Sequence, residues 1–157
     1  METIMFYNEN EENGYLSNYY LVPITIDGIL YKSSEHYYQS QKTLDAAFAE
    51  RIRTAETCDD AKNLGNSDEC EYRSDWKTYR NMAMLRVLIE KFTQNPDLKK
   101  FLLDTGDAVL AECAVNDRIW GIGLSLHADD RFYPAKWNGQ NLLGYVLMMA
   151  RDSLRCI

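Results

Sequence analysis

Residues 24–42 read ITIDGILYKSSEHYYQSQK, and this stretch joins a predicted pair of strands to a predicted helix. Asp27-Gly28 separates two runs of alternating apolar residues, Ile24–Ile26 and Ile29–Tyr31, and this pattern is a strong signal for a β-hairpin with a two-residue turn. Either serine of Ser33-Ser34 can cap the helix that follows, because its hydroxyl accepts a hydrogen bond from a free first-turn N–H. The stretch therefore predicts a small hairpin that leads directly into a helix.

The predicted helix carries an acid, an amide and an amine on one face. Glu35, Gln39 and Lys42 are separated by steps of four and three residues, which return to the same side of a helix. Aromatic side chains, Tyr38 among them, edge this face. Such a face can hold a polar ring and move a proton, although the same pattern occurs more often in a capped surface helix with solvated charges. Two polar and aromatic clusters downstream favour the functional interpretation.

Helix signals dominate the remainder of the chain. The clearest lies between Trp76 and Phe92, where large side chains recur at helical spacing and are predicted to belong mostly to the core. These side chains are Trp76, Tyr79, Met82, Leu85, Leu88, Ile89 and Phe92. A shorter helix, 59–64, is predicted to stop at Gly65, because glycine accepts the left-handed conformation that ends many helices. The polar segment 66–74 is predicted to be a loop.

The other elements complete an α+β pattern. A short strand is predicted at 4–7, and further helices are predicted at 46–53, from Pro96 to Gly106, and at 141–154. Segment 108–114 stays open between a short strand and a buried helical turn, and 124–140 is predicted to be a long loop. The sequence therefore predicts a helix-dominated α+β fold with a small N-terminal hairpin or sheet, in a single domain that spans residues 1–157.

The chain has 157 residues and a formal net charge of −7 at pH 7. This length suits one domain with a sizeable core, and the charge argues against general binding to nucleic acid or to an anionic membrane. No apolar run is long enough to span a bilayer. The N-terminal METIMF lacks the basic and apolar regions of a signal peptide. A cytoplasmic protein without a membrane partner is therefore predicted.

The sequence contains no recognisable metal motif. Its four cysteines form no Cys-x-x-Cys pair, and His36 lies far from His127. Reduced thiols are the simplest account of such cysteines in a cytosolic protein. We therefore predict no metal and no cofactor.

A basic and aromatic cluster surrounds the start of the helix at Trp76. Arg73, Lys77 and Arg80 recur at helix-face spacing if that helix reaches back to Arg73. Together they could hold a phosphate, Arg as a fork and Lys as a point charge, although a solvated basic face is the commoner case. Trp76 could stack on a base or simply pack.

Further polar groups stand beside aromatic residues and glycines. Glu112 and Asn116-Asp117 precede Trp120-Gly121-Ile122-Gly123, a combination that suits a sugar or a base. As a phosphate loop, the lone Gly-x-Gly is weak evidence. Asn141 opens the last helix and is as suited to capping it as to contacting a ligand. Asn18 either holds a turn or presents its amide to a ligand.

Taken together, these motifs resemble the NADAR family, also called YbiA-like, and the match runs in order over nearly the whole chain. They are Phe6-Tyr7, Leu16-Ser17-Asn18-Tyr19, Ser34–Lys42, Trp76, Met82, Lys91-Phe92, Asp117–Gly123 and Gln140–Gly144, followed by Leu147-Met148 and Arg151. The resemblance implies a single helix-rich α+β domain, no metal, and a cytosolic N-glycosidase. Members are linked to hydrolysis of phosphoribosylamino-pyrimidine intermediates of riboflavin synthesis, and others to removal of ADP-ribose from guanine in nucleic acid. Segment 124–139 looks longer than in compact bacterial members, which leaves the substrate open.

For such a reaction we predict three catalytic residues. Cleavage between a sugar C1 and an exocyclic nitrogen builds positive charge on the sugar and needs a proton on the leaving group. Glu35 is predicted to be the acid and base, with a raised pKa if its aromatic neighbours exclude water. Asp117 would hold the ribose hydroxyls or the attacking water. Lys42 either neutralises phosphate or attacks C1 of an opened ribose as an amine and forms a Schiff base.

Nine further residues are predicted to bind the substrate. Trp76 and Trp120 would stack on the base, and Asn18 and Asn141 would bond to its edge or to the sugar. The full set is Asn18, Tyr38, Gln39, Arg73, Trp76, Lys77, Trp120, Gly121 and Asn141.

Two other function classes stay open at this point. A non-catalytic nucleotide or ADP-ribose binding module would keep the stacking residues but would need no acid, and a purely structural helical domain ranks last. Within the enzyme class, the predicted partner is a small phosphoribosyl or ADP-ribosyl substrate. ADP-ribosylated nucleic acid remains the second possibility, and the acidic net charge leans weakly toward the small molecule.

Overall fold

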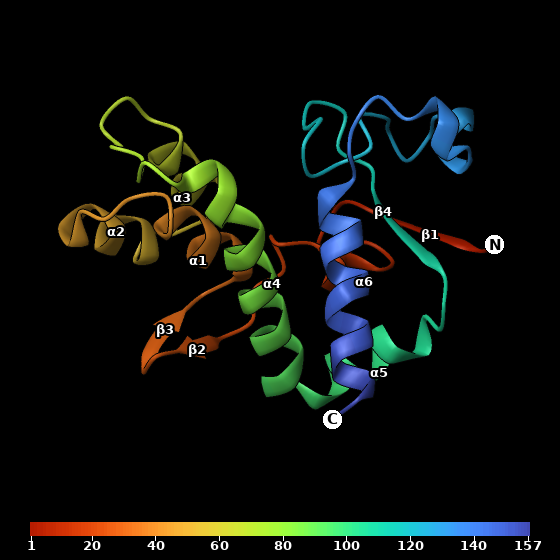
Figure 1. Cartoon of the computed structure of the whole chain (residues 1–157), viewed down its shortest axis with the longest axis horizontal. Helices are drawn as coiled ribbons and strands as arrows, with labels where there is room; N and C mark the ends of the chain where they lie inside the picture. The colour runs from red at the N-terminus through yellow and green to blue at the C-terminus, as the bar shows by residue number, and fades with distance from the viewer. The chain divides into compact units, whose positions relative to one another are not determined.

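The chain forms six α-helices and four short strands, and the computed structural model describes all residues from 1 to 157 (Figure 1). Its internal contacts divide it into two compact units, residues 1–20 with 95–157 and residues 21–94. The predicted helix-dominated α+β fold is confirmed, and the organisation of residues 1–157 as one domain stays a prediction.

The predicted hairpin lies in the unit formed by residues 21–94. Its strands, β2 (Ile24–Ile26) and β3 (Ile29–Tyr31), pair in the antiparallel sense. Asp27 and Gly28 have φ values of 53° and 78°, the left-handed values that a tight hairpin turn requires. The hairpin prediction is therefore confirmed, turn included.

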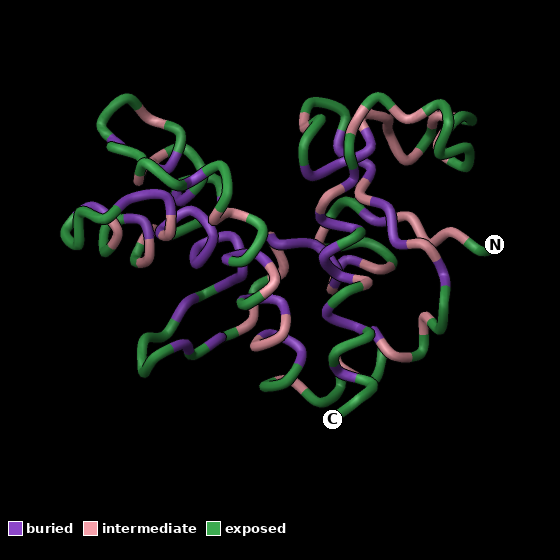
Figure 2. The backbone as a smooth tube through the Cα atoms, in the orientation of Figure 1, coloured by how far each residue is buried: buried purple, intermediate pink, exposed green.

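Four helices follow the hairpin in this unit: α1 (Ser34–Ser40), α2 (Ala46–Arg53), α3 (Cys58–Gly65) and α4 (Trp76–Gln94). α1 packs against the other three, and all of its residues are buried (Figure 2). Its N-cap is Ser33, whose hydroxyl accepts a hydrogen bond from the backbone N–H of His36. The burial excludes the commoner interpretation of this sequence pattern, a capped helix on the surface.

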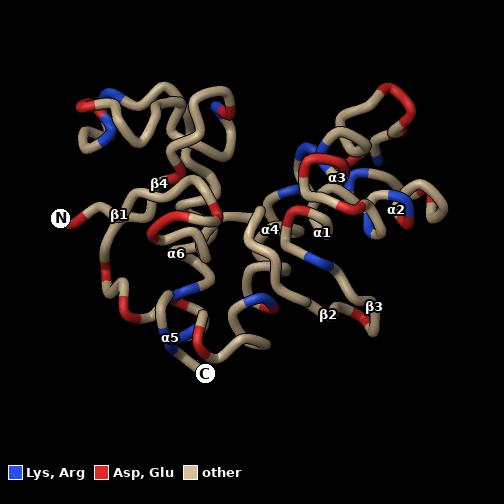
Figure 3. The backbone as a smooth tube through the Cα atoms, turned by 180° about the vertical axis from the view of Figure 1, so that it is seen from behind, with Lys and Arg blue, Asp and Glu red and all other residues tan.

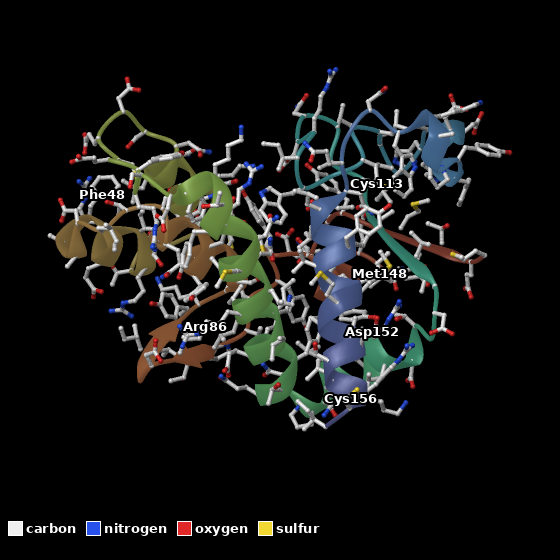
Figure 4. The ribbon with its side chains drawn as sticks, in the orientation of Figure 1. Phe48, Arg86, Cys113, Met148, Asp152 and Cys156 are labelled. Carbon is white, nitrogen blue, oxygen red and sulfur yellow. The ribbon has the colours of Figure 1, made fainter.

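A small apolar cluster joins α2 to α3. Phe48 and Ile52 of α2 pack with Ala61 of α3 and with Cys70 in the segment that follows. Phe48 is labelled among the side chains in Figure 4. This contact fixes α3 against the rest of its unit, and α3 in turn packs against α1.

α3 ends in a way that the sequence did not predict. Gly65 is its last residue and has no positive φ, and the C-cap is Asn66, with φ of −101°. The helix therefore ends at Gly65 as predicted, but the left-handed conformation predicted for Gly65 is wrong. A Cβ at this position would lie 2.1 Å from Oε1 of Gln39, so glycine is needed here for close packing and not for its φ.

The buried stripe of α4 is shifted from the predicted one. Trp76 and Phe92 are buried as predicted, but Met82 is 67% exposed. The buried positions are Trp76, Ala83, Met84, Val87, Leu88, Lys91 and Phe92. Lys91 is fully buried, and this loss of hydration lowers the pKa of its amine to about 7 against a smaller, opposing effect of Cys58.

The other unit, residues 1–20 with 95–157, is built on two parallel strands. β1 (Thr3–Phe6) pairs with β4 (Val109–Glu112), so the segment that the sequence left ambiguous contains a strand. The remaining elements are the helices α5 (Pro96–Asp104) and α6 (Leu142–Arg155) and the 3-10 helices η1 (Gly14–Leu16), η2 (Asp129–Phe132) and η3 (Pro134–Lys136).

Two sets of contacts cover β4. Ala111 and Cys113, the latter labelled in Figure 4, pack with Ile122 and with side chains of the long loop, including Trp137. α6 packs against β4 and against α5. The apolar face of α6 is buried, and it includes Leu143, Leu147, Ala150 and Leu154. No helix in the chain has the length and apolar character that crossing a membrane would need.

Gly144 permits the close approach of α6 to β4. A Cβ at Gly144 would lie 1.9 Å from the carbonyl oxygen of Leu110 and 2.5 Å from Nδ2 of Asn141. In an ordinary helix, Gly→Ala stabilises by about 1 kcal/mol. For Gly144→Ala we expect the opposite sign, a loss of about 1–3 kcal/mol in the free energy of unfolding, because the added methyl overpacks a backbone contact.

Urea unfolding monitored by circular dichroism would measure this change. Met149→Ala is the matched control, because Met149 lies on the same helix and is 53% exposed, and exposed positions usually change stability by less than about 0.5 kcal/mol. A Gly144→Ala protein at least as stable as the parent would show that α6 does not pack on β4 in this way.

Candidate active site

Glu35 and Gln39 form a buried pair on α1. Glu35 lies in the first turn of the helix, where the helix dipole favours a carboxylate. One turn later, Nε2 of Gln39 donates a hydrogen bond of 2.7 Å to Oε1 of Glu35. Only 7% of Glu35 and 3% of Gln39 are exposed. The predicted acid and amide thus lie together, and the amide orients the carboxyl group.

Lys42 follows the C-cap of α1 and is 5% exposed. Its Nζ donates a hydrogen bond of 2.6 Å to Oδ1 of Asn66. The same Nζ lies 5.8 Å from the ring centroid of Tyr38 and 5.3 Å from that of Tyr72. Both aromatic rings and the amide oxygen are groups that attract a positive charge.

Asn66 and Tyr72 were missed in the sequence, where they belonged to a predicted polar loop. Besides Lys42, Asn66 also contacts Tyr72, whose hydroxyl lies 3.4 Å from Oδ1. The only signal that could have singled out Asn66 is its position directly after Gly65, at the end of a predicted helix. Nothing in the sequence indicated that this end lies beside α1.

Arg73 is not on the helix face that the sequence suggested, because α4 begins at Trp76. Its Nε donates to Oδ1 of Asp75 at 2.6 Å, and its guanidinium lies 3.7 Å from the ring centroid of Tyr79. The segment before α4 carries acidic as well as basic residues (Figure 3). The charge of Arg73 is therefore balanced locally, and phosphate binding by Arg73 and by the exposed Lys77 stays a prediction.

Trp76 is buried in an aromatic cluster. Its ring centroid lies 5.1 Å from that of Tyr38, 6.4 Å from that of Tyr79 and 6.5 Å from that of Tyr72. Packing, one of the two roles left open, is therefore observed for Trp76. The cluster also links Tyr38 to the residues around Lys42. Stacking of Trp76 on a base and substrate binding by Tyr38 stay predictions.

His36, next to Glu35 in the sequence, has a structural role. Its Nε2 lies 3.0 Å from the carbonyl oxygen of Ala55, which can only accept, so Nε2 carries the proton. Nδ1 therefore accepts from the hydroxyl of Ser33 at 2.7 Å, and that oxygen also lies 3.3 Å from Sγ of Cys58. These contacts use both ring nitrogens of a neutral, fully buried imidazole.

Stability should fall at acidic pH because of this histidine. Burial lowers the pKa of His36 below its ordinary value of 6.5, against a smaller raising effect of the Ala55 hydrogen bond. Below pH 6.5 the unfolded chain therefore takes up a proton that the folded chain resists. We expect the free energy of unfolding to fall with decreasing pH, by at most about 1.4 kcal/mol per pH unit from this group.

Urea unfolding at pH 7.5, 6.5, 5.5 and 5.0 would measure the dependence, and His36→Gln isolates it from the carboxylates. The slope should be shallower in His36→Gln than in the parent over this range. Equal slopes in the two proteins would contradict a neutral His36 in the folded state.

In the other unit, Asp117 holds a turn. Its Oδ1 accepts from the backbone N–H groups of Ile119 at 3.0 Å and of Trp120 at 2.8 Å. Trp120 is buried, and a Cβ at Gly121 would lie 2.7 Å from the Cβ of Ala114. The predicted roles of Asp117 at the ribose and of Trp120 and Gly121 at the base stay predictions.

The turn at 117–123 pairs with the start of α6, so two of the clusters singled out in the sequence come together. The carbonyl groups of residues 118 to 122 accept hydrogen bonds from backbone N–H groups between residues 138 and 143. Gly139 belongs to the same contact, since a Cβ there would lie 2.2 Å from the carbonyl oxygen of Gly121.

Asn141 and Asn18 are both buried in this unit. Asn141 does not cap α6 through its side chain; its Oδ1 accepts from the N–H of Glu112 at 3.1 Å and its Nδ2 donates to the carbonyl of Leu110 at 2.9 Å. These bonds support a structural role for Asn141. Near Asn18 the turn is held by Ser17, whose hydroxyl accepts from the N–H of Tyr19. Ligand contacts of the two asparagines stay predictions.

No three side chains of His, Cys, Asp or Glu lie together in a way that could hold a metal ion. Independently of this, a buried carboxyl group can transfer a proton, and a buried amine can stabilise negative charge or act as a nucleophile. The acid and the amine for these steps, Glu35 and Lys42, lie in or beside α1.

The chain is similar to known proteins over nearly its whole length. The NADAR domain matches residues 5–155. This chain belongs to the NADAR family. One relative is the N-glycosidase YbiA of Escherichia coli (strain K12), 34% identical over 151 residues, which are 96% of this chain and 88% of YbiA. Another is the riboflavin biosynthesis protein VVA0006 of Vibrio vulnificus (strain YJ016), 38% identical over 154 residues, which are 98% of this chain but only 39% of that protein.

The NMR structure of E. coli YbiA has a TM-score of 0.85 to this NADAR chain at 34% sequence identity, and the alignment covers 99% of this chain and 86% of that one. A relative named an N-glycosidase also occurs in Nostoc punctiforme, at 33% identity over 98% of this chain. The family and the fold predicted from the sequence are therefore confirmed.

Proposed function

We propose that this NADAR chain is an N-glycosidase that hydrolyses the bond between C1 of a phosphoribose or ADP-ribose and the exocyclic amine of an amino-pyrimidine or guanine. The C1–N bond breaks, the hydroxyl of a water molecule bonds to C1, and the remaining proton of that water is gained by the leaving nitrogen. Similarity to the N-glycosidase YbiA and to the riboflavin biosynthesis protein VVA0006 supports this reaction class and a small substrate.

The observation that carries the proposal is the pairing of Glu35 with Gln39 inside the unit. A buried carboxyl group whose one oxygen is held by an amide at 2.7 Å keeps its orientation, which a general acid and base needs. Glu35 protonates the leaving nitrogen and then accepts the proton of the attacking water.

The surroundings of Lys42 support one of its two predicted roles. A nucleophilic amine must lose its proton, whereas Asn66 Oδ1 and the rings of Tyr38 and Tyr72 favour the charged form. We therefore propose that Lys42 acts as a cation that neutralises the phosphate of the substrate.

Of the two substrate classes, we favour the small phosphoribosyl molecule over ADP-ribosylated nucleic acid. The formal net charge of −7 disfavours a polyanionic strand more than a single metabolite. We place the reaction in the cytoplasm, since a reducing compartment suits four free cysteines, of which Cys156 is exposed.

The test is incubation of the protein with each substrate class, followed by chromatographic detection of the released base. Release from the phosphoribosylamino-pyrimidine is expected, at a higher kcat/KM than from ADP-ribosylated guanine in an oligonucleotide. Calorimetric titration of the same protein with ADP-ribose measures its affinity for that ligand. Tight binding without cleavage of either substrate would instead support the non-catalytic nucleotide or ADP-ribose binding module.

A further inference from the structure

We propose that the two residues at the end of α3, Gly65 and Asn66, position the side chains that carry the reaction. Gly65 acts on Glu35 through Gln39, and Asn66 acts directly on Lys42. The proposal rests on the function proposed above. In it, Gly65, Gln39 and Asn66 are positioning residues that need not touch the substrate.

The side chain of Gln39 lies across Gly65. A Cβ built on Gly65 would be 2.1 Å from Oε1 of Gln39, 3.0 Å from its Cδ and 3.2 Å from its Cβ. Because Gly65 has no positive φ, its backbone conformation does not require a glycine. A glycine is required because the side chain of Gln39 fills the space that a Cβ at position 65 would occupy.

The orientation of the Gln39 amide follows from this contact. Nε2 faces Glu35 at 2.7 Å, so Oε1 has to point to the other side of the amide group. On that side Oε1 is buried and accepts no hydrogen bond from any N–H or O–H group. It lies against Gly65, where only a weak C–H···O contact is available. Any larger residue at position 65 would push the amide out of this place and away from Glu35.

Asn66, the residue after Gly65, holds the side chain of Lys42. Its Oδ1 accepts from Nζ of Lys42 at 2.6 Å, while its backbone N–H donates to the carbonyl of Lys62 at 3.0 Å, one turn back in α3. The backbone from which the Asn66 side chain extends is therefore anchored to the helix. α3 packs against α1, so one helix end fixes both Glu35 and Lys42.

The first test is a double-mutant cycle of Gly65→Ala and Gln39→Ala, read as kcat/KM for base release. Gly65→Ala alone should lower kcat/KM about 10- to 100-fold, since small displacements of a catalytic group have effects of this size. In the Gln39→Ala background, where the amide is already gone, the same change should alter kcat/KM by less than about threefold. A full Gly65→Ala effect in that background would overturn the proposed route through Gln39.

The second test does not depend on activity. The carboxyl carbon of Glu35, in protein labelled with ¹³C at glutamate Cδ and assigned by its loss in Glu35→Gln, reports the Gln39 contact directly. Its resonance at fixed pH should shift in Gly65→Ala and in Gln39→Ala, with no further shift in the double variant. Because Gly65→Ala can also impair folding, Gln39→Asn gives an independent measurement, since it withdraws the amide from Glu35 but leaves Gly65 unchanged.

An unchanged Glu35 resonance in folded Gly65→Ala, or in Gln39→Asn, would overturn the positioning of Glu35. If the parent protein hydrolyses neither substrate but the resonance shifts as expected, the proposed function fails while the contact stands. The two failures are thus distinguishable.

Asn66 is tested by a matched pair of substitutions. Asn66→Ala removes the acceptor and should lower kcat/KM about tenfold, the lower range for a residue that orients a functional group. Asn66→Gln keeps a neutral amide oxygen that can accept from Lys42 and should lose less activity than Asn66→Ala. Asn63→Ala, at an exposed position of the same helix, is the control and should behave as the parent. A parent-like kcat/KM in Asn66→Ala, or equal losses in Asn66→Ala and Asn66→Gln, would overturn the role of Asn66.

Discussion

Glu35→Gln should lower kcat for release of the base by about 100-fold or more, the scale on which a general acid and base contributes. The substitution keeps the size of the side chain and an oxygen at which the Gln39 amide can donate, so the α1 contacts survive. What it removes is the proton that the leaving nitrogen needs. Single-turnover measurements with the phosphoribosylamino-pyrimidine would give the rate of the chemical step.

Glu50→Gln is the control for this experiment. Glu50 lies on α2 in the same unit, and its side chain is 56% exposed in an ion pair with Arg53. Exposed pairs of this kind contribute little, and activity within about twofold of the parent is expected. Glu35→Gln protein that is folded and releases base at the parent rate would remove Glu35 from the mechanism.

Lys42→Met should lower kcat/KM about 100- to 1,000-fold, the range seen when one group that stabilises transition-state charge is removed. Methionine keeps a long apolar side chain between the rings of Tyr38 and Tyr72 but has no charge for the phosphate. Lys42→Arg keeps the charge, and its kcat/KM should be at least about tenfold higher than that of Lys42→Met. Borohydride added during turnover should trap no adduct, as judged by the mass of the intact protein.

An adduct on Lys42 together with an inactive Lys42→Arg protein would reverse the assignment and establish the Schiff base. Lys62→Met is the control, because Lys62 is an exposed lysine on α3 and has no proposed role in charge stabilisation. Its activity should equal that of the parent.

The elements that could be predicted from the sequence are those with strong local signals. Asp27-Gly28 fixes the hairpin because few residues accept two successive left-handed conformations. Ser33 indicates the start of α1 because its hydroxyl can cap a helix, and Pro96 indicates the start of α5 because proline suits the first helical position. The segment that became β4 could not be assigned in the same way, because its strand pairing is with residues about a hundred positions earlier.

The misplaced core of α4 has a different cause. Ala83 is small and Lys91 is charged, so neither contributes to an apolar pattern, yet both are buried. A lysine can bury its methylene groups, and its burial depends on neighbours that a local window does not contain. Met82 fits the pattern and is exposed. The phase of this helix is set by tertiary packing.

The candidate site was predictable only where its contacts are local in the sequence. Glu35 and Gln39 are one helical turn apart, and their contact follows from the helix alone. Asn66 reaches Lys42 only because α3 packs on α1, and the need for glycine at position 65 arises from a side chain 26 positions earlier. Contacts of this kind join distant segments, and the spacing of residues in the sequence does not predict them.

The parallel pairing of β1 with β4 imposes an order on how the chain is made. Residues 3–6 are synthesised well before residues 109–112 and find their partner only when those have been added. At bacterial or eukaryotic elongation speeds this delay is roughly 5 to 20 seconds. Residues 21–94 are contiguous and complete in the meantime. During synthesis β1 therefore spends that interval without its partner strand, and an unpaired strand edge is prone to aggregation.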